Sequence, residues 1–335
     1  MKIVIFIPLL ASFLLTLYVI PFWIKKAKQI GLLWQDMNKY KRPLVAGSGG
    51  IVAVIGFLLG VLAYIAIKTF YFKSSENIIE IFSLTTTILF LAGVGFVDDL
   101  LGWQRGGLSI KVRLIMCVFA SIPLVVVNAG VSEMSLPFIG NIDFGLLYPL
   151  FLIPLGITGA GTTFNFLAGY NGLEAGQGIL VLSGLALVTW LTGTTWLAVI
   201  CLLMVMALLG FWFYNQYPAK VFPGNSITYT IGGLIACLAI FGNIEKIAVF
   251  FFIPYILEVF LKARGKLKKQ SFGKPNKDDS LEMPYDKVYG LEHLAILMLK
   301  KLKGKVYEKD VVWLIHFMQI IVIVTGLYLF RASIF

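Results

Sequence analysis

The sequence LAGVGFVDDLLGWQRGGLSIKVR, residues 91–113, decides both the fold and the place of the chemistry. It begins as the end of an apolar segment and places two adjacent carboxylates, Asp98 and Asp99, where that segment would meet water. Lys111 and Arg113 follow at the start of the next apolar segment. Because a helix C-terminus carries partial negative charge, the acids need a cation beside them, which would be a metal ion, Lys111 or both. The pattern predicts the edge of an active site at a membrane surface.

Apolar segments of similar length recur along the whole chain. The 335 residues are 59% hydrophobic and 13% charged, which is outside the range of soluble domains. A helix of about 20 apolar residues crosses a bilayer. Such segments predict ten spans, at residues 3–24, 47–67, 78–97, 111–129, 145–165, 176–193, 195–213, 226–243, 246–262 and 311–331. We therefore expect one all-α polytopic membrane domain over residues 1–335, with a small extracytoplasmic hairpin within residues 130–144.

The basic residues gather in alternate loops. Residues 25–46, 98–113, 220 and 262–309 carry 23 of the 28 Lys and Arg residues. The positive-inside rule places these loops in the cytoplasm and both termini outside, in a cell or endoplasmic reticulum membrane. This distribution explains the net charge of +11, which therefore does not indicate a nucleic-acid partner. Within the longest loop, GLEHLAILMLKKLKGK (290–305) predicts an amphipathic helix in the membrane interface.

The adjacent acids constrain the local geometry. Neighbouring residues of a helix point about 100° apart, so Asp98 and Asp99 cannot both face one atom from an intact helix. Either the helix ends there or the two carboxylates have different partners. A solvated pair is the simple alternative, while a functional pair would form a site for a hard cation. Mg²⁺ favours oxygen ligands and is often held by one or two carboxylates together with substrate phosphates.

Four further polar clusters fall on the same predicted side of the membrane. Each has a simple explanation: an orienting charge, a turn, or a lipid-binding basic loop. Each also fits an anionic phosphate or nucleotide ligand. Asn165 near the end of a span needs a partner, which is either a ligand or a neighbouring helix. The candidates are Gln35, Asp36, Asn38 and Lys39; Asn165, Asn171 and Glu174; Lys220, Phe222 and Asn225; and Arg264, Lys268, Lys269 and Lys274.

Together these motifs resemble one family, the polyprenyl-phosphate N-acetylhexosamine-1-phosphate transferases of glycosyltransferase family 4. The most specific segments are QDMNK (35–39), GFVDDLL (95–101), GLSIK (107–111), NFLAGYNGLEAGQ (165–177) and SLEMPYDK (280–287). The segments NGLEAGQ and LEMPYDK are similar to the archaeal and eukaryotic dolichyl-phosphate branch. GLSIK, with its spacing from the acids, is closer to bacterial members.

The resemblance implies a role for each matched position. Asp98 and Asp99 match the acidic pair near the phosphates, and Lys111 matches a lysine that contacts the donor diphosphate or the acceptor phosphate. Asn171 and Asn225, with Asp99, match positions around Mg²⁺ or Mn²⁺. The other matched positions bind substrate: Phe222 stacks on uracil, and Gln35, Asp36, Asn38 and Lys39 lie at the nucleotide end.

The sequence departs from the family pattern in three places. Asn225 is an amide where the family usually has Asp, so it offers a metal ion less charge. Gly47 stands where the dolichyl branch tends to have Glu. The basic loop lacks the His or Arg-His-Arg pattern and offers Lys268, Lys269, Phe272 and Lys274 instead.

The implied reaction transfers N-acetylglucosamine-1-phosphate from UDP-N-acetylglucosamine (UDP-GlcNAc) to dolichyl phosphate and releases UMP. It would be the first step of lipid-linked oligosaccharide assembly for N-glycosylation, and the resemblance allows a homodimer. Three alternatives stay open from the residues: a transferase that uses undecaprenyl phosphate, a weakly active member given Asn225, and an ion-coupled transporter. Transporter sites lie near the bilayer midplane, whereas these acids lie at the end of a span.

Overall fold

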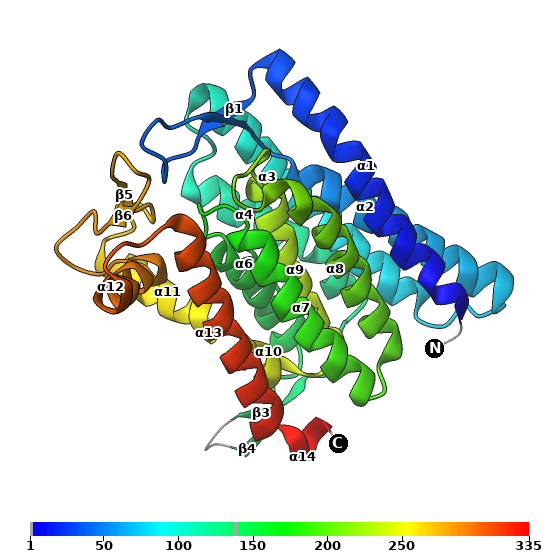
Figure 1. Ribbon diagram of the computed structural model, residues 1–335. Helices are drawn as coiled ribbons and strands as arrows, with labels where there is room; N and C mark the ends of the chain where they lie inside the picture. The colour runs from blue at the N-terminus through cyan, green and yellow to red at the C-terminus, as the bar shows by residue number, and fades with distance from the viewer. Residues whose placement is uncertain (1–2, 137–139, 335) are drawn as a thin grey trace.

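The chain forms an oblique bundle of helices with polar loops at one end (Figure 1). The computed structural model describes residues 3–136 and 140–334, without the side chains of residues 104, 105, 135, 136 and 141. Three two-stranded antiparallel sheets are the β structure within these residues. The prediction of an all-α polytopic membrane protein is confirmed.

Seven helices are long and apolar enough to cross a membrane. They are α1 (Phe6–Ile30), α2 (Gly50–Ala66), α3 (Ile78–Arg105), α7 (Leu173–Leu191), α8 (Thr195–Asn215), α9 (Asn225–Gly242) and α13 (Glu308–Leu329). A 3₁₀ turn, η1 (Ile3–Ile5), precedes α1, and a π-helical turn, η2 (Ile67–Tyr71), extends α2.

The other three predicted spans are each divided into two helical pieces. They comprise α4 (Ile110–Ala120) with α5 (Ile122–Val126), η3 (Tyr148–Leu152) with α6 (Ile153–Phe164), and α10 (Glu245–Phe251) with α11 (Ile253–Arg264). In all three, the second piece begins with Ile-Pro, at Pro123, Pro154 and Pro254. Proline has no backbone N–H and fits the first turn of a new helix, so it separates the pieces. The count of ten spans stays a prediction.

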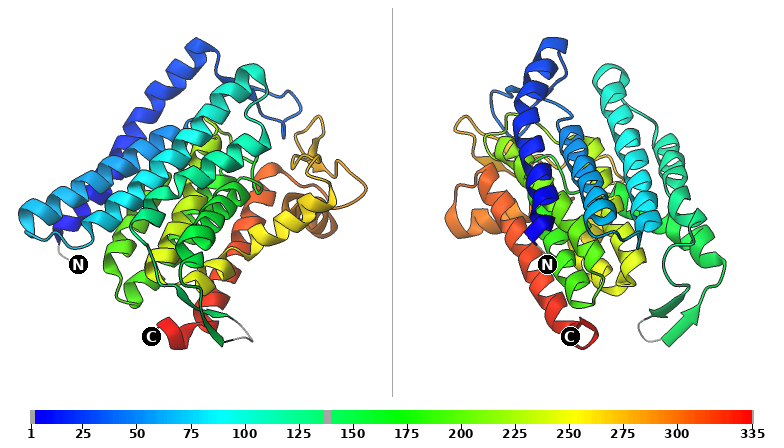
Figure 2. Two further views of the ribbon diagram at one scale, coloured as in Figure 1. Left: turned by 180° about the vertical axis from the view of Figure 1, so that it is seen from behind. Right: turned by 90° about the vertical axis from the view of Figure 1, so that its right-hand side faces the viewer.

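Helix α9 forms the centre of the bundle. It is the most buried of the seven long helices, and α3 and α6 pack along it. Seen from the side, α13 lies on one flank and α3 to α5 on the other (Figure 2). On α2, small residues allow close packing against α1, because a Cβ atom on Gly56 would lie 2.1 Å from Oγ1 of Thr16.

The remaining elements are short and lie at the two ends of the bundle. Strands β1 (Leu33–Gln35) and β2 (Leu44–Ala46) pair, as do β5 (Lys274–Pro275) and β6 (Leu281–Glu282). At the opposite end lie α14 (Arg331–Ile334) and the antiparallel pair β3 (Glu133–Leu136) and β4 (Gly140–Asp143). This pair confirms the predicted hairpin; residues 137–139, between its strands, lie outside the described residues.

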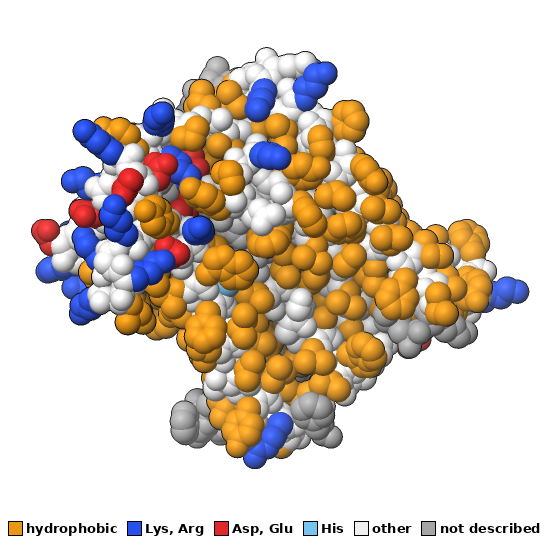
Figure 3. Space-filling model, viewed as in Figure 1, with side chains coloured by type: hydrophobic (Ala, Val, Ile, Leu, Met, Phe, Trp, Pro, Cys, Tyr) orange, Lys and Arg blue, Asp and Glu red, His pale blue; other side chains and the backbone are white. Residues whose placement is uncertain are grey.

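Charge separates the two ends. The basic and acidic side chains gather over α12 (Leu291–Lys303) and β5–β6, while hydrophobic side chains cover most of the bundle below them (Figure 3). The predicted amphipathic helix is α12, which buries Leu291, Ala295 and Ile296. Its last turn carries Lys300, Lys301 and Lys303, which are exposed. The predicted site residues therefore lie at the polar end of an apolar bundle.

Candidate active site

Asp98 and Asp99 lie within the last turns of α3, which continues to Arg105. Both carboxylates are buried, and they accept hydrogen bonds from different groups. Oδ1 of Asp98 accepts a hydrogen bond from the backbone N–H of Leu108 at 2.7 Å, and its Oδ2 accepts one from Nδ2 of Asn225 at 2.8 Å. Asp99 accepts one from the backbone N–H of Asn225 at 2.8 Å. The helix is therefore intact, and Asn225 donates to both acids through two different groups.

The first turn of α9 holds Asp99 in place. The backbone N–H groups of Asn225 and Ser226 donate to its two oxygens at 2.8 and 3.5 Å. A helix N-terminus carries partial positive charge, so it stabilises a carboxylate at this position. Gly224 makes the approach possible, because its φ is +75° and a Cβ atom there would lie 2.2 Å from Oδ2 of Asp99. An L-residue would meet both strain and a clash.

The cation beside the acids is Arg113. Its Nη1 lies 3.1 Å from Oδ2 of Asp98. Lys111, for which we predicted the catalytic contact, is exposed on α4 and does not meet either acid. Two residues along a helix are about 200° apart, so Lys111 and Arg113 point to nearly opposite sides. The geometry therefore favours Arg113 for the role that the sequence assigned to Lys111.

A cavity of about 760 Å³ opens beside Asp99. Seven of the predicted site residues line it: Gln35, Asp36, Asp99, Asn165, Glu174, Phe222 and Asn225. The loop at Phe222 is fixed to the end of β2, because Phe222 N–H donates to the carbonyl of Ala46 at 2.8 Å. Trp34, Gln270 and Phe272 also line the cavity, and of these three only Phe272 was singled out from the sequence. The cavity thus lies where the ends of α3 and α9 meet three polar loops.

The oxygen atoms of the cavity suit a hard cation. Of the three carboxylates that line it, Asp36, Asp99 and Glu174, Asp99 lies next to the amide of Asn225, and the amide of Asn165 lines the same cavity. Because Nδ2 of Asn225 donates to Asp98, its Oδ1 is the amide atom left for a cation. Among the residues that the structure describes, no three His, Cys, Asp or Glu side chains form a metal cluster. One carboxylate, amide oxygens and substrate phosphates are a set that Mg²⁺ accepts.

Asn171, the third predicted metal ligand, lies elsewhere. It does not line the cavity, and its Nδ2 donates to Oδ2 of Asp36 at 3.0 Å and to Oε2 of Glu308 at 3.1 Å. Asn165 shares the cavity with Asp99 and Asn225 instead, and its Oδ1 accepts a hydrogen bond from Oγ1 of Thr228 at 3.1 Å. The geometry therefore favours Asn165 as the second amide near a cation.

A buried polar cluster contains Asp36, which lines the cavity, and Asn38, Lys39, Asn171 and Glu308, which lie behind that wall. The sequence analysis identified four of these residues but not Glu308, the first residue of α13. Glu308 is 1% exposed and pairs with Lys39. The sequence does contain a signal for Glu308: it is an acid at the start of an apolar span. A charge buried there needs a partner, which would have made Glu308 a candidate.

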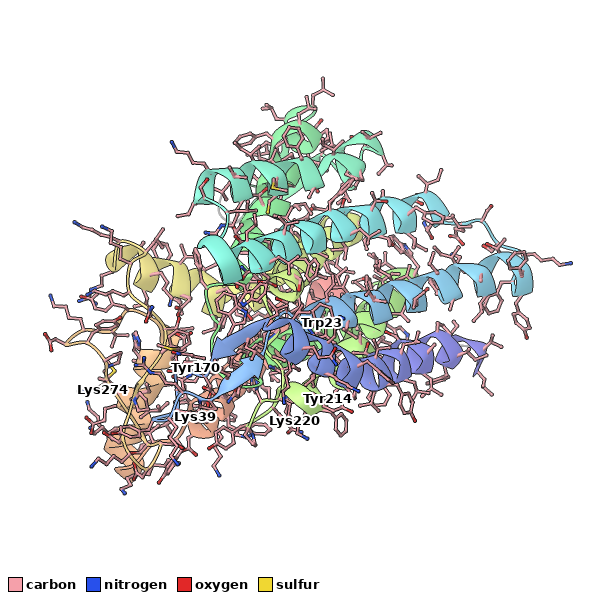
Figure 4. The ribbon with its side chains drawn as sticks, turned by 90° about the horizontal axis from the view of Figure 1, so that it is seen from above. Trp23, Lys39, Tyr170, Tyr214, Lys220 and Lys274 are labelled. Carbon is pink, nitrogen blue, oxygen red and sulfur yellow. The ribbon has the colours of Figure 1, made fainter. Side chains whose placement is uncertain are left out.

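The three predicted lysines of the basic loop, residues 265–290, do not line the cavity. Lys268, Lys269 and Lys274 are exposed, and Lys274 lies at the outer edge of the molecule (Figure 4). The ammonium of Lys269 lies 4.7 Å from the centre of the Tyr285 ring. Neutral side chains of the same loop, Gln270 and Phe272, face the cavity instead.

The last predicted residue, Glu174, lines the cavity from the start of α7. Its Oε1 accepts a hydrogen bond from the backbone N–H of Gly169 at 2.9 Å, while its Oε2 is buried without a partner among the described residues. This contact fixes the loop between α6 and α7, residues 165–172, against α7. The loop therefore presents a defined wall to the cavity.

Comparisons with known proteins identify the family of the chain. The sequence profile of glycosyl transferase family 4 matches residues 81–243. A Saccharolobus solfataricus protein, provisionally named a UDP-N-acetylglucosamine--dolichyl-phosphate N-acetylglucosaminephosphotransferase, is 34% identical over 97% of this chain and 96% of its own. The Dictyostelium discoideum protein of that name is 29% identical over 73% of this chain and 68% of its own. An Enterococcus faecalis phospho-N-acetylmuramoyl-pentapeptide-transferase is 26% identical over 76% and 80%.

The chain therefore belongs to glycosyl transferase family 4. It is an integral membrane transferase, since these relatives are transferases and seven helices can cross a membrane.

Proposed function

We propose that this protein transfers N-acetylglucosamine-1-phosphate from UDP-GlcNAc to dolichyl phosphate and releases UMP. The observation that carries the proposal is the cavity beside Asp99, which lies between the apolar bundle and the polar loops. A lipid phosphate can reach such a cavity from the bilayer, and a nucleotide sugar can reach it from water. The 34% identity over 97% of the chain to a relative of that name supports the choice of substrates.

The reaction exchanges one P–O bond for another. An oxygen of the lipid phosphate attacks the β-phosphorus of the donor, the bond to the bridging oxygen breaks, and UMP leaves with the electron pair. Because a phosphate monoester has a second pKa near 6, the acceptor is mostly a dianion at neutral pH and needs no strong base. We therefore assign positioning, and not proton removal, as the main role of the chain's residues.

The polar groups that line the cavity, and the Arg113–Asp98 pair next to them, then each have a task. Arg113, held by Asp98, stabilises negative charge on the transferring phosphoryl group. Asp99, fixed by the first turn of α9, orients the oxygens around it. Phe222 offers an aromatic face to the base. Asp99, Asn165 and Asn225 would hold Mg²⁺ or Mn²⁺, which would neutralise charge on the donor diphosphate.

We further propose that the cavity faces the cytoplasm and that both termini lie on the other side. The basic side chains around β5–β6 and α12 support this orientation. Labelling with a membrane-impermeant maleimide tests it, because Cys117, Cys201 and Cys237 are buried and add no background. Lys246→Cys should react in intact cells and Lys274→Cys only after permeabilisation; the reverse pattern would overturn the orientation.

A homodimer stays a prediction.

The decisive experiment measures UMP release by the purified protein with UDP-GlcNAc, Mg²⁺ and a lipid phosphate. We expect release that depends on the lipid and is faster with dolichyl phosphate than with undecaprenyl phosphate. Faster release with undecaprenyl phosphate would reassign the acceptor. Failure to release UMP with either lipid and either metal ion would overturn the transferase proposal for this sequence.

A further inference from the structure

Glu308 joins segments of the chain that are distant in sequence. Its carboxylate accepts hydrogen bonds from the backbone N–H of Asn171 at 2.7 Å, from Nδ2 of Asn171 at 3.1 Å and from Nδ2 of Asn38 at 3.4 Å. It also forms an ion pair with Lys39. One side chain at the start of α13 therefore holds both the loop between β1 and β2 and the loop between α6 and α7.

The contacts of Asn38 extend this network to the basic loop. Nδ2 of Asn38 donates to the carbonyl of Gly169 at 2.9 Å, and its Oδ1 accepts from the N–H of Gly273 at 3.1 Å. Gly169 and Phe272, the neighbour of Gly273, line the cavity. Glu308 thus supports the loop-built wall of the cavity from behind.

The charges in this network depend on one another. Lys39 lies 3.5 Å from Oδ2 of Asp36 and 4.3 Å from the centre of the Tyr217 ring. Asp36, Lys39 and Glu308 are all at least nine-tenths buried, so each charge relies on its partners and not on water. Replacing Glu308 by a neutral residue leaves Lys39 with Asp36 alone, and Asp36 itself lines the cavity.

We propose that Glu308 is a positioning residue that sets the binding of the soluble nucleotide sugar. The wall that it supports consists of loops at the polar end of the bundle, where a water-soluble substrate enters. Asp99 belongs to a different wall, formed by the end of α3 and the start of α9, and the Arg113–Asp98 pair lies next to that wall without lining the cavity. Glu308 does not line the cavity, so it acts through Asn38, Lys39 and Asn171. The inference rests on the proposed function for the identity of the substrate.

The test compares Glu308→Gln, which keeps the shape and removes the charge, with the unaltered protein. We expect the KM for UDP-GlcNAc to rise about tenfold, which corresponds to one charge-assisted hydrogen bond. The kcat and the KM for dolichyl phosphate should change less than about twofold, because the other wall is intact. Glu308→Asp should recover part of the affinity. Glu76→Gln, an exposed glutamate in the η2–α3 connection, is the matched control.

Lys39→Met provides a second variant that removes the same ion pair. It should raise the same KM, and the double variant should be less impaired than the product of the two single effects. This pair of results keeps the inference testable if Glu308→Gln does not fold. A fall in kcat with an unchanged KM, an equal rise in both KM values, or no change at all would overturn it.

Calorimetric titration with UDP-GlcNAc separates this inference from the proposed reaction. If the unaltered protein binds UDP-GlcNAc but releases no UMP, the reaction fails, and Glu308→Gln should still bind about tenfold more weakly. Equal affinity of the two proteins would overturn the role of Glu308 alone. If the unaltered protein does not bind UDP-GlcNAc, both proposals are overturned.

Discussion

Arg113 and Asp98 join the start of α4 to the end of α3 through a hydrogen bond of 3.1 Å between Nη1 and Oδ2. Asp98 is buried, whereas the Arg113 side chain is 27% exposed. The Arg113 side chain is therefore held by Asp98 and Tyr229 and is still partly accessible to a phosphate. A guanidinium that is held by one carboxylate keeps further N–H donors, and with these it can contact a second anion.

The first prediction compares the two cations of α4. Arg113→Ala should lower kcat for UMP release about 10²-fold, the loss expected when one donor to a developing charge is removed. Lys111→Ala should cost much less, since Lys111 is exposed and points away from the acids. Steady-state kinetics of the two variants check this, and a larger loss for Lys111→Ala would restore the assignment made from the sequence.

The second prediction concerns the amide at Asn225. In Asn225→Asp, a carboxylate would replace the amide that donates to Asp98 at 2.8 Å, so like charges would meet. The melting midpoint in EDTA should fall, and added Mg²⁺ should raise it more than in the unaltered protein, because a third acid binds the cation more tightly. An equal response of both proteins to Mg²⁺ would place the cation away from residue 225.

The third prediction tests the approach of α9 to Asp99. Gly224→Ala should lower kcat/KM by at least about 10²-fold, because a methyl group there displaces a carboxylate that positions reacting groups. Gly93→Ala on α3 is the control, since a Cβ atom at Gly93 has no atom within 4 Å. Similar kcat/KM values for the two variants would mean that a displacement of Asp99 does not affect the reaction.

The fourth prediction concerns the acid Glu292, at the start of α12. A Cβ atom on Gly290 would lie 2.5 Å from Oε2 of Glu292 and 2.9 Å from Oε1 of Glu258, so the two carboxyl groups lie close together. Burial, and then the neighbouring Glu258, raise the pKa of Glu292 well above its ordinary value of 4.5. The folded protein therefore keeps a proton that the unfolded chain loses above pH 4.5, and stability falls as the pH rises.

Glu292→Gln should remove this dependence on pH. The melting midpoint of the variant should exceed that of the unaltered protein by more at about pH 7.5 than at about pH 5. Burial also lowers the pKa of His293 to about 4, but His293 is present in both proteins, so its contribution cancels in the comparison. An advantage that is the same at both pH values would contradict the raised pKa.

The sequence predicted where the spans lie, but not that three of them are divided into two helical pieces. Apolar length alone located every long helix, because crossing a bilayer requires it. It did not predict the three interruptions, although Pro123, Pro154 and Pro254 mark them in the sequence. An average of hydropathy measures only how apolar a segment is, so it takes no account of the backbone N–H that proline lacks.

The residues of the candidate site could be predicted from the sequence at helix ends, but not in the loops. Asp99 and Asn225 follow directly from their motifs at helix ends. Which of Lys111 and Arg113 faces Asp98 depends on the rotation of α4, which the spacing from Asp99 does not determine. In the basic loop, we predicted mainly the charged side chains as binding residues. Charged side chains are better hydrated at the surface, whereas the neutral Gln270 and Phe272 line the cavity.

The partners of Glu308 have a consequence for the biogenesis of the protein. Lys39 and Glu308 are separated by 269 positions in the sequence. At a synthesis rate of about 5–20 residues per second, Lys39 leaves the ribosome on the order of 10 to 50 s before its partner. During that interval the early spans are in the membrane without a complete cavity. A translation product that stops before residue 308 is therefore inserted but lacks the contact that fixes its first loop.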